Sequence, residues 1–125
     1  MEIIQTKNMP ESNGHYSQVI AHNGILYFSG QLPLDPKSKK IPEAIEDQTK
    51  QALDNVLLLL KEAGSSKNDV LQMRIYISDI RLWNKVNTIY CNFFGKHRPV
   101  RCIVAVNELH FGCFIEIEAV AAQNY

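Results

Sequence analysis

Two helical patterns with one alternating strand between them limit most strongly the folds open to this chain. Apolar residues at helical spacing run from about Ile45 to Ala63, and Gly64 follows as the expected stop. Asp79 is predicted to cap a second helix, which ends at Gly95. Between them, residues 70–77 alternate as a strand does. One predicted face of that strand carries Leu71, Met73, Ile75 and Ile77, and the other carries Gln72, Arg74 and Tyr76.

Short apolar runs elsewhere predict five more strands. They lie near Glu2–Thr6, Gln18–Ala21, Ile25–Ser29, Val100–Val106 and Phe114–Ala121. Residues 31–42 contain three prolines and are predicted to form a loop. The resulting order is β-β-β-α-β-α-β-β. The 125 residues, without an internal repeat or linker, predict a single α+β domain with a mixed sheet.

One face of the predicted sheet lacks a cover. Right-handed crossovers place both helices on the same face, so the opposite face stays open in a single copy. Strand alternation predicts that this open face mixes apolar and charged side chains, while Cys102 points toward the helices. The residues expected on the open face are Tyr76, Ile103, Ala105, Phe114, Arg74, Arg101 and Glu116. Such a surface needs a partner, and symmetric self-association is the simplest one.

Composition excludes several classes of function. Thirteen basic residues balance thirteen acidic ones, so the formal net charge is zero and no basic stripe predicts a nucleic-acid partner. Three cysteines spaced eleven residues apart match no zinc motif, and reduced thiols indicate the cytoplasm. The four histidines are scattered, without metal-ligand spacing. The N-terminus lacks the pattern of a signal peptide, and no apolar run is long enough to cross a membrane.

Arg101 and Glu116 are the candidate functional pair, because nucleotide-binding and hydrolase motifs are absent from the sequence. If the last two strands are neighbours, both side chains can face one cavity. Arginine grips a carboxylate through two parallel hydrogen bonds, and glutamate can activate water or donate a proton to nitrogen. The alternative is a structural role, in which the two residues pair with each other or with Arg74 and Glu118.

The order of short motifs along nearly the whole chain resembles the Rid (YjgF) family. The opening motifs are Gly14–Gln18 and Ser29–Gln31, ahead of Asp35-Pro36. The helical motifs are Gln48 with Ala52–Asn55, and Val86-Asn87-x-x-Tyr90 with Phe93-Phe94. The closing motifs are Arg98–Arg101 and Ile115–Ala119. Each fragment is short, but their combination in this order is specific.

The resemblance implies a chorismate-mutase-like fold for one Rid-like domain spanning residues 1–125. It implies a homotrimer whose sheets form a central barrel, with ligand clefts between subunits. The implied activity is deamination without metal or cofactor. Reactive 2-imino and enamine acids, such as 2-aminoacrylate, 2-iminopropanoate and 2-iminobutanoate, would be hydrolysed to 2-keto acids and ammonia. A non-catalytic regulatory trimer that binds a small carboxylate in the same cleft is the alternative.

The resemblance also implies a role for particular residues. Arg101 would hold the substrate carboxylate, and Glu116 would position and activate the water. The rest of the pocket would be Tyr16, Ser29, Gly30, Asn87 and the backbone of Ile103. The chain departs from the family pattern at His15, at Leu109–Gly112, and at Ile103, where cysteine is frequent. His15 and His110 are interpreted as packing or surface residues.

Overall fold

The computed structural model describes residues 1–10 and 14–124. Its two α-helices are α1 (Ile45–Glu62) and α2 (Trp83–Phe94). The strands are β1 (Glu2–Ile4), β2 (Val19–His22), β3 (Ile25–Phe28), β4 (Val70–Ile77), β5 (Val100–Ala105) and β6 (Ile115–Ala122). Three 3-10 turns join them: η1 (Lys67–Asp69), η2 (Ile80–Leu82) and η3 (His110–Gly112). The predicted order of helices and strands is therefore confirmed.

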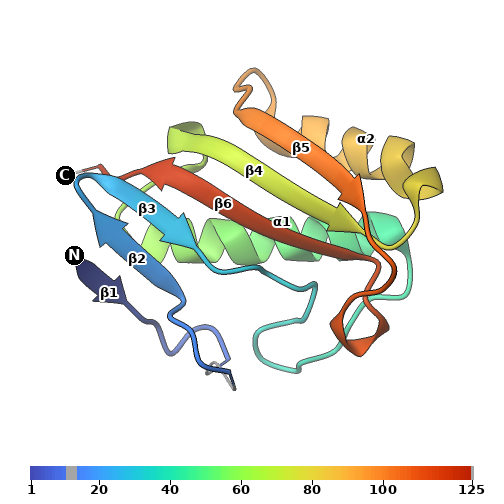
Figure 1. Ribbon diagram of the computed structural model, residues 1–125, viewed down its shortest axis with the longest axis horizontal. Coiled ribbons are helices and arrows are strands. Elements are labelled where there is room, and N and C mark those ends of the chain that lie inside the picture. Colours follow the sequence, from blue (N-terminus) through green and yellow to red (C-terminus); the bar gives the residue numbers. More distant parts are fainter. Residues whose placement is uncertain (11–13, 125) are drawn as a thin grey trace.

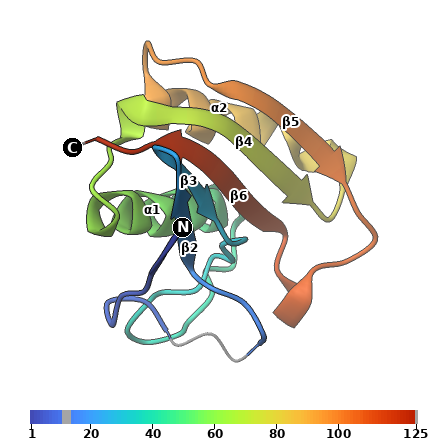
Figure 2. The ribbon, with the colours of Figure 1, turned by 60° about the vertical axis from the view of Figure 1, so that its left-hand side comes forward.

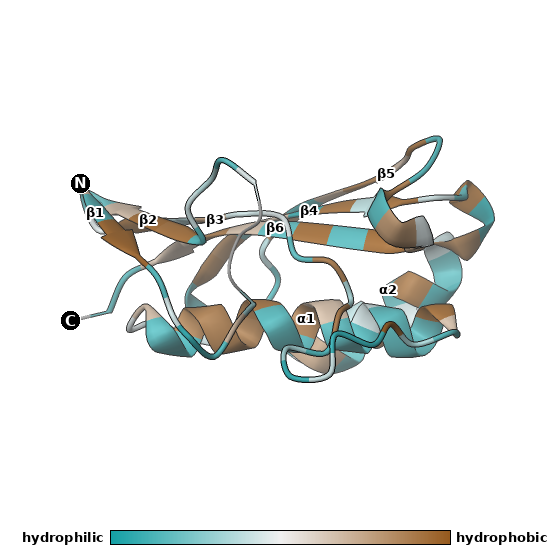
Figure 3. Cartoon of the chain, turned by 90° about the horizontal axis from the view of Figure 1, so that it is seen from below, coloured by the Kyte–Doolittle hydropathy of each residue, from teal (hydrophilic) through white to brown (hydrophobic). Residues whose placement is uncertain are grey.

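The six strands form one sheet in the order β1-β2-β3-β6-β4-β5 (Figure 1). β4 and β5 are parallel, and the remaining neighbours are antiparallel. Both helices lie on the same side of this sheet (Figures 2 and 3). The α+β class, the mixed sheet and the one-sided helical layer are thus confirmed.

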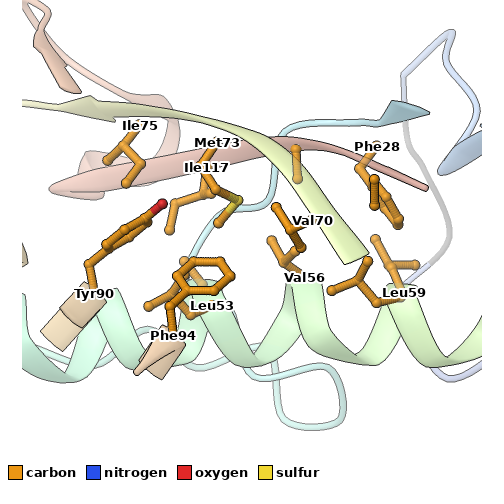
Figure 4. Close-up of a cluster of buried hydrophobic side chains, with 14 of the residues drawn as sticks. Phe28, Leu53, Val56, Leu59, Val70, Met73, Ile75, Tyr90, Phe94 and Ile117 are labelled. Atoms are coloured by element: carbon orange, nitrogen blue, oxygen red, sulfur yellow. The ribbon is translucent and has the colours of Figure 1, made fainter. Parts of the chain in front are cut away.

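The core lies between α1, α2 and the middle of the sheet. Helix α1 turns a continuous apolar stripe toward the strands, with Leu53, Val56 and Leu59 almost fully buried. Figure 4 shows these side chains facing Met73 and Ile117 of the central strands. Burying a side chain of this size contributes about 1.5–3 kcal/mol. This packing fixes which face of β4 and β6 is covered.

The helix ends follow local rules. The first turn of α1 carries Glu46 and Asp47, whose charges favour the positive end of the helix dipole. After α1, Gly64 adopts a φ of +74°, a conformation that glycine reaches without strain. Asp79 caps η2 rather than α2 directly, because its carboxylate accepts a hydrogen bond from Arg81 N at 2.9 Å. η2 then continues into α2 at Trp83.

One end of β4 departs from the predicted alternation. Val70 pairs with Ala121 and Gln72 pairs with Val120, so β4 has one extra residue at this point. This register shift is a β-bulge. Val70 therefore points into the core, while Leu71 is 45% exposed. The prediction that Leu71 shares a face with Met73 is wrong, since the bulge resets the phase of the strand.

The predicted faces of β5 are also wrong. Arg101 and Ile103 pair with Met73 and Ile75, so they lie on the helix-covered side, and Ala105 follows them. Cys102 pairs with Arg74 on the open face and is exposed. The physical reason is the strand order. The prediction assumed that β5 pairs with β6, but β4 lies between them, so the faces of β6 do not determine the faces of β5.

The open face mixes apolar and charged side chains, as predicted. Among its exposed apolar residues are Ile3, Tyr27 and Val104. On the same face the Tyr76 hydroxyl donates a hydrogen bond to Glu118, and this bond raises the pKa of Tyr76 to about 12. No helix within the described ranges is both long enough and apolar enough for a membrane span.

Candidate functional site

A cavity of about 440 Å³ lies where the segment before β2, the segment after β3, α1 and η3 meet. Its polar lining is Tyr16, Gln18, Ser29, Gln31, Asn55 and His110. Its apolar lining is Met9, Pro10, Leu32, Leu34, Leu59 and Phe111, with Gly14 and Gly30 completing the wall. Three residues predicted for the pocket, Tyr16, Ser29 and Gly30, are therefore brought together.

Hydrogen bonds hold the β3 side of this cavity in place. Gln31 N donates to the Ile117 carbonyl at 2.6 Å, and Ile117 N donates back to the Gln31 carbonyl at 3.0 Å. The Gln31 amide group reaches Ser29 Oγ at 3.3 Å. From α1, the Asn55 amide donates to the carbonyls of Leu32 and Leu34 at 3.0 and 2.9 Å. The wall is therefore preorganised by the scaffold rather than left as a free loop.

Glu116 lies on the open face of β6, directly against Gly30. An ideal Cβ at position 30 would lie 3.1 Å from Glu116 Cδ and closer still to Oε2. Only glycine leaves room for the carboxylate in this position. Burial, and then the negative charge of Glu118, raise the pKa of Glu116, while His110 acts in the opposite direction. A carboxyl group with a raised pKa is suited to both accepting and donating a proton.

Arg101 is held by α2 rather than by a carboxylate. Its Nη1 donates to Asn87 Oδ1 at 2.8 Å. Its guanidinium lies over the rings of Tyr90 and Trp83, 4.8 and 5.5 Å from their centroids. Within the described residues Arg101 forms no ion pair, and Arg74 is the arginine near Glu118. A neutral amide and two aromatic faces orient the positive charge without neutralising it, so it can receive an anionic group.

Within one copy, Arg101 and Glu116 belong to different faces of the sheet. β4 lies between their strands, and Arg101 pairs with Met73 whereas Glu116 pairs with Tyr76. The condition for a shared cavity within one chain, that β5 and β6 are neighbours, is therefore not met. Two groups of residues result. We call Glu116, Gly30, Ser29, Tyr16 and His110 the Glu116 half-site, and Arg101, Asn87, Trp83 and Tyr90 the Arg101 half-site.

Ile103 lies next to the Arg101 half-site but packs partly against the core. Trp83 was missed by sequence reasoning, although its spacing to Asn87 and Tyr90 places all three on one helix face. The prediction that His110 is a packing or surface residue agrees with the structure, in which His110 is exposed and also lines the cavity. In the described part of the chain, no cluster of three or more metal-ligating side chains occurs.

Comparisons with known proteins agree with the predicted resemblance. Residues 6–123 match the model of the endoribonuclease L-PSP family. A RutC family protein of Pyrococcus horikoshii is 41% identical over 121 residues, covering 96% of each chain. TdcF of Escherichia coli, which is named as a reactive intermediate deaminase, is 32% identical over 126 residues and 98% of both chains.

Solved structures give the same result for the fold. The crystal structure of TdcF with bound serine matches with a TM-score of 0.93, covering 99% of this chain and 100% of that one. The YjgF gene product of Escherichia coli gives the same TM-score at 32% identity, with the same coverage. From the match over residues 6–123 and these relatives, the chain belongs to the endoribonuclease L-PSP family, the family of the Rid (YjgF) proteins.

Proposed function

We propose that this protein is a deaminase that hydrolyses reactive 2-imino and enamine acids to 2-keto acids and ammonia. Its substrates include 2-aminoacrylate, 2-iminopropanoate and 2-iminobutanoate. It acts as a homotrimer in the cytoplasm, where the free thiols of Cys91, Cys102 and Cys113 stay reduced. The site needs neither a metal nor a cofactor, because the C=N carbon is already electrophilic.

The observation that carries this proposal is that one chain presents two groups on opposite faces of its sheet. One is a guanidinium that forms no ion pair among the described residues, and the other is a partly buried carboxyl group. Arg101 is oriented by Asn87 at 2.8 Å and has no ion pair among the described residues. The Glu116 carboxyl lies against Gly30 with a raised pKa. A second copy that places its Arg101 half-site over the Glu116 half-site would complete a cleft for a small carboxylate.

The chemistry follows from the two half-sites. Arg101 of one copy binds the substrate carboxylate, which places the neighbouring imine carbon near Glu116 of the other copy. Glu116 accepts one proton of a water molecule as the water oxygen adds to the carbon of the N-protonated imine, and the product is a neutral carbinolamine. Glu116 then gives this proton to the nitrogen and takes up the proton of the carbinolamine hydroxyl as the C–N bond breaks, so ammonia leaves and a 2-keto acid remains. An enamine enters the same route after protonation at its terminal carbon. Acid–base catalysis of this kind contributes about 10²–10⁴-fold.

The homotrimer is supported by the open face. Exposed apolar side chains there, including Tyr27 and Val104, lie beside the charged pair Arg74 and Glu118, 3.7 Å apart. Covering such a surface with identical copies buries the apolar residues and leaves no sheet face uncovered. Sedimentation equilibrium should give three chains per particle, and a monomer at micromolar concentration would contradict the proposal.

The test of catalysis couples the purified protein to a serine dehydratase and follows the loss of the released imine. Arg101→Ala and Glu116→Gln should each abolish the acceleration while the protein remains folded. Each site takes one half from each of two copies, so remixing the two inactive variants in equal amounts should restore about one quarter of the wild-type rate. No acceleration by the wild type would refute deamination. Failure of the mixture to regain activity would refute the shared site.

A non-catalytic carboxylate sensor is the second candidate. It is favoured by the Arg101 half-site, which is fully oriented by residues of α2 without any contribution from Glu116. A sensor would bind 2-keto acids tightly without turnover, and Glu116→Gln would leave its function unchanged. A deaminase would lose its rate in the same variant.

A further inference from the structure

We infer that His110 is a second catalytic residue of the Glu116 half-site, and that it donates the proton that enamine substrates need at their terminal carbon. This inference rests on the proposed deaminase function and adds a step to which Arg101 and Glu116 have not been assigned. It concerns 2-aminoacrylate and other enamine acids, which must become iminium ions before water can add.

An enamine needs an acid at carbon. Its C2=C3 double bond shares the nitrogen lone pair and is electron-rich, so water does not add to C2. Hydrolysis begins when the π electrons of C2=C3 form a bond from C3 to a proton and the nitrogen lone pair forms the C=N bond. A charged imidazole suits this step, because the ring becomes neutral as the substrate becomes positive. The ring then takes up a new proton from solvent.

The two groups already assigned leave one direction for the terminal carbon. C2 is planar, and its three neighbours are the carboxylate carbon, the nitrogen and C3. With the carboxylate held by Arg101 of one copy and the nitrogen near Glu116 of the other, C3 points toward the remaining wall. That wall contains Gly30 and Ser29, which also line the cavity. An acid for C3 must therefore belong to the residues around this cavity.

Among the described residues that line the cavity, the side chains that titrate are those of Tyr16 and His110. A tyrosine hydroxyl is a weak acid, whereas histidine gives up and takes back a proton readily near neutral pH. His110 also lies within electrostatic range of Glu116. Burial and the charge of Glu118 raise the pKa of Glu116, and the charge of His110 opposes them. His110 is therefore the group at this wall that is best suited to donate a proton.

The η3 turn holds the His110 side chain at the cavity. A hydrogen bond of 3.2 Å from Cys113 N to the His110 carbonyl closes the turn. The imidazole packs against the Phe111 ring, with 3.8 Å between the two centroids. The imidazole forms no hydrogen bond or ion pair with another described residue. Its nitrogens are therefore available to a substrate, and its exposure to solvent allows it to recover a proton.

The test compares an enamine with the imine that gives the same products. A serine dehydratase releases 2-aminoacrylate, an amino-acid oxidase acting on alanine releases 2-iminopropanoate, and both are hydrolysed to pyruvate and ammonia. His110→Gln should lower the ratio of kcat/KM for the enamine to kcat/KM for the imine by about 10²-fold or more, because the imine needs no proton at carbon. His22→Gln changes an exposed histidine outside the cavity, so this matched control should keep the ratio. An unchanged ratio in His110→Gln would overturn the inference and leave the deaminase function intact.

The stereochemistry of the product separates the inference from the proposed function. Serine with a single deuterium at a defined C3 position is converted in tritiated water, and the pyruvate is reduced at once to lactate. His110 would protonate a single face of C3, so the wild type should give a chiral methyl group and His110→Gln a racemic one. A racemic methyl group from the wild type would overturn the inference even if hydrolysis is accelerated. A chiral methyl group without faster hydrolysis would support the inference and count against the deaminase function alone.

Discussion

Replacement of Gly30 by alanine tests whether imine hydrolysis depends on the position of the Glu116 carboxylate. The new methyl group would occupy the space of Glu116 Oε2 and lie 3.1 Å from Cδ and 3.4 Å from Cγ. The clashing atoms belong to a flexible side chain, so Glu116 can turn away while the backbone stays in place. We therefore expect the substitution to move the carboxylate rather than to unfold the protein.

The expected sizes of the two effects differ widely. Turning one side chain away from a favoured rotamer costs about 0.5–1.5 kcal/mol, which lowers the melting temperature by only a few degrees. Displacement of a catalytic group by about 1 Å costs about 10²-fold in rate, or about 2.7 kcal/mol of transition-state stabilisation. Gly30→Ala should thus lose about 99% of the activity with most of its stability intact.

The assay measures kcat/KM for imine hydrolysis and the melting temperature on the same samples. Gly24→Ala is the matched control, because Gly24 has a φ of +79° and nothing within 4 Å of the position of a new Cβ. A left-handed alanine costs about 1–2 kcal/mol, so this control should lose stability and keep its activity. If Gly30→Ala retains the wild-type rate, the contact between Gly30 and Glu116 does not position a catalytic group.

Three further predictions follow from the same contacts. Burial raises the pKa of Glu116 above 4.5, so the folded state holds this proton more tightly than the unfolded state does, and the associated stability is lost as the pH rises through the folded pKa. Glu116→Gln should therefore melt higher than the wild type at pH 7, with a difference that disappears below about pH 4; an equal difference at both pH values would contradict this. Within the described residues the buried Tyr90 hydroxyl has no hydrogen-bond partner, so Tyr90→Phe should gain about 1 kcal/mol in urea unfolding and keep its activity. A loss of stability would show that a bound water satisfies the hydroxyl. Arg101→Lys loses the planar fork and the contact with Asn87, so its affinity for 2-keto acids in calorimetry should fall at least about tenfold; an unchanged affinity would show that charge alone is sufficient.

Periodicity in the sequence predicts the elements of the fold well. The apolar stripe of α1 and the alternation of residues 72–77 both correspond to the buried face in the structure. These predictions succeed because a helix or strand repeats its own geometry along the chain. Leu71 is the exception. A bulge depends on how two strands pair, so the sequence of one strand alone does not predict it.

The site was only partly predictable for the same reason. The residue types of Arg101 and Glu116 indicate carboxylate binding and proton transfer, whichever strands carry them. Their relative placement depends on the strand order, and an insertion of β4 between β5 and β6 cannot be deduced from alternation. Trp83 and Tyr90 have a helical spacing to Asn87 that sequence analysis could have used, but their contact with Arg101 requires α2 to pack beside β5.

The insertion of β4 also bears on how the protein would behave at low abundance. Under the proposed mechanism a solitary chain carries both reacting groups but cannot direct them at the same molecule. Specific activity would then fall on dilution below the dissociation constant of the assembly and recover on reconcentration, without any chain unfolding. The total rate of imine hydrolysis in a cell would rise more steeply than the number of chains synthesised. A shortage of subunits would therefore lower the turnover per chain before it affected folding.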